Sequence, residues 1–144
     1  MSTDSDLSDQ KVIRLTIPAA AEYLRLARLA AADVGSRAGL DFEEIEDLRI
    51  AVDELSHALV APGTEGDVMS LTFAIRGATV TVDGEGPPGA THRMVIQSEL
   101  SRTIIAAVVD EHALHTDGDI VRFFLRKESR EGRTGGRETS GAEG

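Results

Sequence analysis

The clearest hydrophobic pattern in the chain lies between Asp41 and Leu59 and predicts one amphipathic helix. Its apolar positions recur at spacings of three and four and share one helical face: Ile45, Leu48, Val52, Leu55 and Leu59. Asp41 stands where an N-cap belongs, and Glu44 follows three residues later, which is the spacing of a capping box. We therefore expect the helix to begin near Phe42.

A second line of residues follows the same helix at spacings of four, three and four: Glu46, Ile50, Asp53 and His57. This spacing points an acid and an imidazole the same way, about one turn apart. The line is either a chemical site or the solvated polar flank of an amphipathic helix. The helix alone favours the flank.

The segment before this helix predicts a strand and a second helix. Residues 11–17 alternate in polarity and end at Pro18, as a half-buried strand does. Residues 19–34 are rich in alanine and leucine and stop at Gly35, as a helix does. On this helix we expect Leu26, Leu29 and Ala30 to face inward and the two arginines, Arg25 and Arg28, to project outward.

The second half of the chain predicts a hairpin, a helix and a last strand. Alternating residues 68–76 and 79–83 flank Gly77-Ala78, and a loop rich in glycine and proline follows at 83–89. Helical spacing returns from Ser98, a candidate N-cap, to His115, and residues 120–127 read as a strand. Helices must then cover one face of a mainly antiparallel sheet, which makes the fold class α+β, a two-layer sandwich.

Composition limits the organisation to one domain. We expect residues 1–10 to be a disordered leader, 11–127 to be the domain, and 128–144, which hold almost no apolar residue, to be a disordered tail. No apolar run approaches the roughly 20 residues that span a bilayer, and the polar, acidic start does not resemble a secretory signal. These features predict a cytoplasmic protein with no membrane contact.

Charge and side-chain chemistry exclude several kinds of site. Twenty-five acids against fifteen bases give a formal charge of −10, which disfavours direct nucleic-acid binding and favours a basic protein partner. The chain has no cysteine, so thiolate metal sites and disulfides are excluded. His112 and His115 stand three apart on the expected helix, but no third ligand lies near them in the sequence, and we predict no metal there.

Three stretches in this order resemble a known family: EYLRLARLAAADV, LRIAVDELSHALV and, at the end of the hairpin, VDGEG. Together they resemble the anti-sigma factors of the serine-kinase (RsbW-like) type, in the GHKL family of ATPase-fold proteins. The resemblance covers residues 12–127. It implies a GHKL-like sandwich, a homodimer, an alternative sigma factor and an anti-anti-sigma protein as partners, and Mg-ATP as the family's cofactor.

The family's helix motif, E-x-x-x-N, supplies an acid and an asparagine that holds magnesium. Matched by spacing, it places Asp53 at the acid, as catalytic base, and His57 at the asparagine. An imidazole nitrogen is a poor ligand for Mg²⁺, and the shorter aspartate side chain holds its carboxylate further back. Both changes weaken the case for phosphoryl transfer.

The two remaining ATP motifs also depart from the family pattern. In D-x-G-x-G the aspartate recognises the adenine amino group, and the match here is Asp83. Its glycines, Gly84 and Gly86, follow one and three residues later, so each stands one position before the place that the motif gives it. In the last motif, a G-x-G that meets phosphates, Thr103 matches the family's threonine, which puts Glu99 and Ser101 at the glycines. A carboxylate there repels a polyanion. The lid before this helix is also short.

We therefore expect a binding module that sequesters an alternative sigma factor and requires no cofactor. By resemblance, an arginine in an E-x-x-R context touches the partners, and Arg25 is the match with Arg28 in reserve. Two alternatives remain open. One is an active serine/threonine protein kinase that uses Mg-ATP to phosphorylate the anti-anti-sigma protein. The other is a degenerate ATPase-fold domain that binds a different ligand and no sigma factor.

Overall fold

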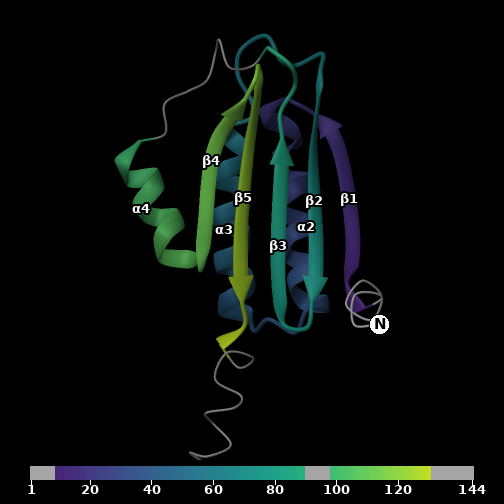
Figure 1. Ribbon diagram of the computed structural model, residues 1–144, viewed down its shortest axis with the longest axis vertical. Coiled ribbons are helices and arrows are strands. Elements are labelled where there is room, and N and C mark those ends of the chain that lie inside the picture. The colour runs from purple at the N-terminus through teal and green to yellow at the C-terminus, as the bar shows by residue number, and fades with distance from the viewer. Residues whose placement is uncertain (1–8, 90–97, 131–144) are drawn as a thin grey trace, which may run out of the picture.

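The computed structural model describes residues 9–89 and 98–130 and has the predicted two-layer α+β architecture (Figure 1). One layer is an antiparallel five-stranded sheet in the order β1-β2-β3-β5-β4, and α2 and α3 cover one of its faces. Along the chain the elements are β1 (Lys11–Pro18), the 3-10 turn η1 (Ala21–Tyr23), α2 (Leu24–Arg37), α3 (Phe42–His57), β2 (Val68–Arg76), β3 (Thr79–Glu85), α4 (Glu99–Val108), β4 (Glu111–Asp117) and β5 (Ile120–Glu128). No helix in these described residues is long and apolar enough to cross a membrane.

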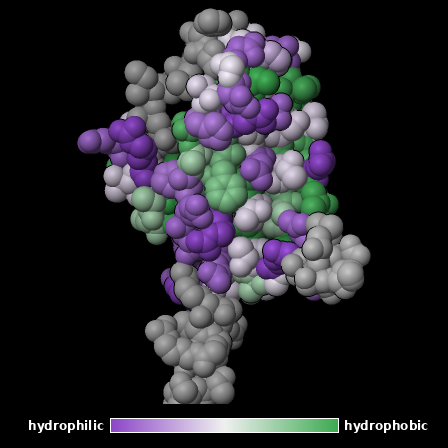
Figure 2. Space-filling model, in the orientation of Figure 1, coloured by the Kyte–Doolittle hydropathy of each residue, from purple (hydrophilic) through white to green (hydrophobic). Residues whose placement is uncertain are grey.

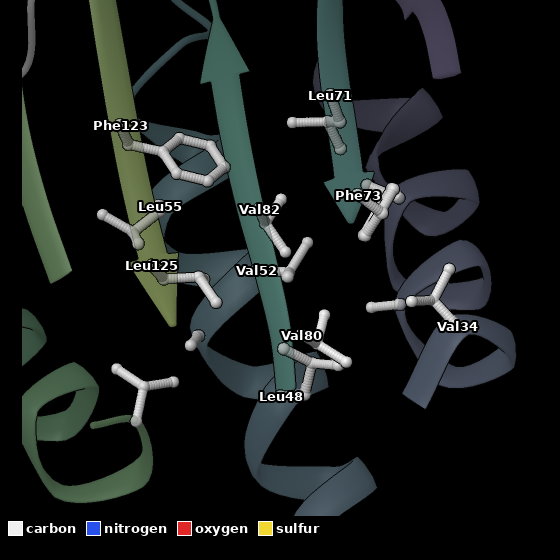
Figure 3. Close-up of a cluster of buried hydrophobic side chains, with 14 of the residues drawn as sticks. Val34, Leu48, Val52, Leu55, Leu71, Phe73, Val80, Val82, Phe123 and Leu125 are labelled. Atoms are coloured by element: carbon white, nitrogen blue, oxygen red, sulfur yellow. The ribbon is translucent and has the colours of Figure 1, made fainter. Parts of the chain in front are cut away.

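The core lies between the sheet and the helix pair (Figure 3). Alternate residues of β2, β3 and β5 point toward the helices, among them Phe73, Val82 and Leu125. They meet the apolar face of α3, where Leu48 and Val52 are fully buried as the sequence predicts. None of the helices in the described residues covers the opposite sheet face, and Figure 2 shows hydrophilic side chains spread over it around a smaller hydrophobic area.

The start of α3 confirms the predicted capping box. The Asp41 carboxylate accepts a hydrogen bond from the Glu44 amide at 2.8 Å, and the Glu44 carboxylate accepts one from the Asp41 amide at 2.9 Å. The helix begins at Phe42 and ends at His57. Two donors that a helix start leaves open are thus satisfied locally.

The prediction for α2 is wrong at both of its boundaries. The segment begins with the η1 turn and continues through Gly35 to Arg37. Gly35 is buried, and a Cβ on it would lie 3.2 Å from Ile45 and 3.3 Å from Leu48. This glycine therefore permits close packing of α2 on α3 instead of ending the helix. The left-handed residue after the helix is Gly39, with φ +85°.

The predicted inward line of α2 is also wrong. Leu26 and Leu29 are 43% and 55% exposed, and Ala30 is only partly buried. The buried line consists of smaller residues together with two larger ones: Leu24, Ala27, Ala31 and Val34. Because α2 packs closely on its neighbours, the alanine side fits inside and the two leucines remain on the surface.

The helix expected from Ser98 to His115 is two elements. Ser98 caps α4 as predicted, but the helix ends at Val108, and Val109 is extended with φ −130° and ψ 163°. Residues 111–117 then form β4, which pairs with β5 through a tight turn containing Gly118 at φ +66°. The predicted element order therefore lacked one strand.

The ordered domain extends beyond its expected end at residue 127. Glu128 belongs to β5, and its amide donates to Asp110 at 2.7 Å. Ser129 is 2% exposed, and its amide donates to the Ala78 carbonyl at 2.9 Å. The Arg130 amide donates to the buried Glu44 carboxylate at 2.6 Å. The remainder of the expected leader and tail, residues 1–8 and 131–144, and most of the expected lid, 90–97, lie outside the described residues.

Candidate functional site

A cavity of about 600 Å³ opens at the C-terminal end of α3, beside the N-terminus of α4. We call it the α3–α4 pocket. It is lined by Ala20, Ala21, Glu54, His57, Ala58, Val60, Ala61, Pro62, Glu65, Ser98 and Ser101. Its size is that of a small-molecule site, and most of its wall is aliphatic.

The polar groups of this pocket are held by local hydrogen bonds. Glu54 accepts a 2.7 Å bond from the Ser101 hydroxyl, which joins α3 to α4. The Ser98 hydroxyl accepts from the Ser101 amide at 3.0 Å as the α4 cap. His57 Nδ1 lies 2.8 Å from the Asp53 carbonyl oxygen. A carbonyl only accepts, so Nδ1 carries a hydrogen, and in the tautomer that this bond selects Nε2 is an acceptor.

Asp53, the candidate base, does not line the pocket. Its carboxylate faces α2, where Arg28 Nη1 lies 2.8 Å from Oδ1. The acid of α3 that does line the pocket is Glu54, which the sequence reasoning missed. One signal could have found it: the E-x-x-x-N motif read one residue later starts at Glu54 and places Ala58 at the asparagine position. A methyl group cannot ligate magnesium, so neither register supplies the family's amide ligand.

Asp83 and Gly84 lie on opposite faces of β3. Asp83 points to the open face, where a hollow of about 450 Å³ is lined by residues including Thr72 and Phe124, and burial raises the pKa of its carboxyl group. Gly84 points to the helix-covered face. A Cβ on Gly84 would overlap the Phe123 ring, so this ring fills the place that a side chain at position 84 would take.

The structure brings only two of the predicted nucleotide-site residues, His57 and Ser101, together in the α3–α4 pocket. Gly86 is buried against Leu59, and Thr103 is exposed on α4. Neither belongs to the lining of the pocket. Asp83 and the pocket are on different sides of the sheet. By resemblance, these residues would bind adenine, activate a nucleophile and bind phosphates. In the described part of the chain they do not surround one cavity.

No group of three metal-ligating side chains occurs within residues 9–89 and 98–130. The histidine pair expected on a helix lies on β4. His112 is partly buried against the inner side and His115 is exposed. A spacing of three puts two strand residues on opposite faces, so the pair cannot share a metal as it could on a helix.

The outer face of α2 is the other candidate site. Tyr23, Leu26 and Leu29 form what we call the α2 ridge, and they are 38%, 43% and 55% exposed. Arg25 is exposed beside them and makes no ion pair with any described residue, Glu22 included. Arg28, in contrast, is held by Asp53. Of the two predicted partner-binding arginines, Arg25 is the available one.

No protein-family model matches the chain. Individual relatives do match. The chain is 38% identical over 61 residues to the serine-protein kinase RsbW of Bacillus cereus, a match that covers 42% of this chain and 38% of the relative. It is 49% identical over 47 residues to the serine-protein kinase RsbW of Staphylococcus epidermidis, covering 33% of this chain and 30% of the relative.

A longer match links the chain to the anti-sigma-F factor RsbW of Mycobacterium tuberculosis. The two are 28% identical over 121 residues, which cover 80% of this chain and 71% of the relative. The chain thus spans well under half the length of the two kinases and most of the anti-sigma factor. These matches confirm the resemblance drawn from the three sequence stretches.

Proposed function

Because this chain is a relative of the RsbW proteins with a GHKL-like sandwich, we propose that it is an anti-sigma factor. In this proposal it sequesters an alternative sigma factor by direct contact in the cytoplasm, and an anti-anti-sigma protein releases it. A homodimer, as the family resemblance implies, is the expected working form. The protein acts as a binding module and needs no nucleotide.

The observation that carries the proposal is the α2 ridge with Arg25 beside it. Leu26 and Leu29 expose large apolar side chains next to each other on a helix that has room for them only outside the core. Covering such a side chain is worth about 1.5 to 3 kcal/mol. An unpaired arginine at the border of an apolar patch is a typical interface anchor, because its planar group can take a carboxylate bidentately.

Charge supports two separate steps of this binding. The formal charge of −10 steers a basic protein toward the molecule over long range. At short range Arg25 selects an acidic group on that partner. Sigma factors are DNA-binding proteins with basic surfaces, and acidic side chains among them would meet the ridge.

The kinase alternative is less well supported by the α3–α4 pocket. Its lining holds two carboxylates, Glu54 and Glu65, and no lysine or arginine among the described residues. A nucleotide would bring several negative charges to these acids without a cation to offset them. We therefore expect calorimetry to find no Mg-ATP binding tighter than about 1 mM. A micromolar dissociation constant would make the kinase the better reading.

The decisive experiment measures partner affinity for two arginine variants. A tagged chain captures its sigma factor from native cytoplasm, mass spectrometry identifies it, and the purified pair is titrated. Arg25→Ala should weaken binding by about 2 kcal/mol, close to 30-fold. The control is Arg37→Ala at the far end of α2, where the side chain is exposed and pairs with Asp33, and it should cost less than about 0.5 kcal/mol.

Leu29→Ala tests the apolar part of the same surface. The side chain is 55% exposed, so the fold should be unaffected while partner affinity falls about tenfold. Circular dichroism checks the fold of each variant. Unchanged affinity in both Arg25→Ala and Leu29→Ala would move the interface away from α2 and remove the main support for the proposal.

A further inference from the structure

The chemistry of the α3–α4 pocket is unusual for a site in a nucleotide-binding fold. Of its eleven described lining residues, six carry aliphatic side chains or a proline ring: Ala20, Ala21, Ala58, Val60, Ala61 and Pro62. They come from two segments of the chain, the start of the helical layer and the stretch that follows α3. The cavity therefore has an apolar wall that can hold a hydrocarbon or aromatic body.

The polar groups on the rim are nearly all hydrogen-bond acceptors. Glu54 uses one carboxylate oxygen for the Ser101 hydroxyl, and the other has no described partner. Glu65 accepts from the Gly63 amide through one oxygen in the same way. His57 donates through Nδ1 to a backbone carbonyl, and in the tautomer that this bond selects Nε2 is an acceptor.

Few donors remain to balance these acceptors. The Ser101 hydroxyl hydrogen is directed to Glu54, and its amide hydrogen to Ser98. Glu99 adds a carboxylate in the first turn of α4, where it offsets the positive end of the helix. Among the side chains of the described lining residues only the Ser98 hydroxyl hydrogen is uncommitted, so an anion would meet the repulsion of two carboxylates and few side-chain donors.

We propose that the α3–α4 pocket binds a small organic cation, an amine or guanidine attached to an apolar body. The cationic head donates to Glu54, Glu65 and His57 Nε2, and the body lies on the aliphatic wall. The volume of about 600 Å³ suits a molecule of this kind. The pocket shares no lining residue with the α2 ridge, so this proposal does not rest on the partner contact proposed above.

Three probes that share one hydrocarbon chain test this proposal on the full-length protein. Hexylammonium, hexanol and hexanoate are titrated separately, and amide resonances of residues 54–61 and 98–101 are followed by NMR. Hexylammonium should give saturable shifts with a dissociation constant of about 1 mM. Hexanol should bind several-fold more weakly, and hexanoate more than about tenfold more weakly, because the rim repels its carboxylate.

Matched variants place the binding in the pocket. Glu54→Gln removes one rim charge and should weaken hexylammonium about fivefold or more. The control Glu22→Gln removes the same charge from an exposed residue outside the lining and should leave the affinity unchanged. Ala21→Phe fills the cavity from its exposed edge and should abolish the shifts, with circular dichroism to confirm the fold.

Several outcomes would overturn the proposal. Equal affinity for hexylammonium and hexanoate would reduce the pocket to a hydrophobic hollow with no charge preference. Shifts that persist in both Glu54→Gln and Ala21→Phe would place the binding elsewhere. Absence of saturable shifts up to about 20 mM, or displacement of hexylammonium by Mg-ATP below about 1 mM, would also refute it.

Discussion

The two ends of α3 carry the same kind of side chain in opposite situations. At the N-terminal end the buried Glu44 accepts from the Asp41 and Arg130 amides, and Arg130 also contacts the exposed carboxylates of Asp41 and Glu43. At the C-terminal end Glu54 lines an open cavity and has one hydrogen-bond partner, Ser101, among the described residues. Carboxylates that are fully paired serve the fold, whereas an acid with unused lone pairs is available to a ligand.

The largest loss of stability is expected from removing the segment that pairs with the N-terminal end of α3. Truncation after Lys127 deletes the Ser129 and Arg130 contacts, so the carboxylate of the 2%-exposed Glu44 keeps the Asp41 amide but loses the hydrogen bond from the Arg130 amide. We expect a loss of about 3 to 5 kcal/mol in the free energy of unfolding, or about 10 °C in melting temperature. Truncation after Arg130 is the control. It removes only residues poor in apolar side chains and should leave the melting temperature unchanged.

The second prediction compares one substitution at the two ends. Glu44→Ala leaves the Asp41 and Arg130 amides without their acceptor and should cost about 3 kcal/mol in chemical denaturation. Glu54→Ala removes a single partly exposed hydrogen bond and should cost about 1 kcal/mol or less. Equal costs at the two ends would show that Glu54 is as structural as Glu44.

The smallest expected effect is the pH dependence of the stability that Asp41 provides at the N-terminal end of α3. The Glu44 amide, and then Arg130, lower the pKa of Asp41 below its ordinary value of 3.8. The ionised form thus stabilises the fold. This contribution is complete above the ordinary pKa and is lost as the pH falls through the lower pKa of the folded state.

Asp41→Asn isolates the contribution of the ionised carboxylate, because asparagine keeps an N-cap oxygen but cannot ionise. The variant should melt below the unmodified protein at pH 7, and the difference should shrink between pH 4 and pH 2. Scanning calorimetry across this range provides the measurement. A difference that is constant with pH would contradict the assignment.

The parts of the fold that could be predicted from the sequence are those determined by residues close to one another in the chain. The capping box and the three-and-four spacing of α3 lie within one stretch, so they identify the helix and its first residue. The strand β4 has no such local sequence signal. Its residues continue an apolar spacing that also fits a helix, and only pairing with β5, later in the chain, makes them extended.

The burial of α2 could not be predicted for a related reason. Two lines of apolar residues run along this helix, one with more alanine and one with Leu26 and Leu29. Hydrophobicity alone favours the leucines, but the available space between α2 and α3 favours the smaller side chains. That space depends on Gly35, whose importance appears only when the two helices are packed together.

The candidate site was partly predictable for geometric reasons. His57 and Ser101 line the same pocket because the fold brings both of these motif positions to it, and their role there stays a prediction. Asp53 and Asp83 were each one residue away from the inward position. In a helix one residue turns a side chain by about 100°, and in a strand it reverses the face. Spacing identified the correct elements but not which of two neighbouring residues points inward.

The contact between Gly84 and Phe123 has a consequence for how the chain can be changed. An acid at position 84 cannot enter while the ring is present, since even a Cβ would overlap it. A smaller residue at position 123 alone would leave a cavity in the core, at a cost of about 3 to 5 kcal/mol. The two positions are therefore epistatic: each single substitution is deleterious, and only the pair is compatible with the fold. Placing an aspartate on the inner face of β3 requires two coordinated substitutions, and the order in which they occur determines how unstable the intermediate is.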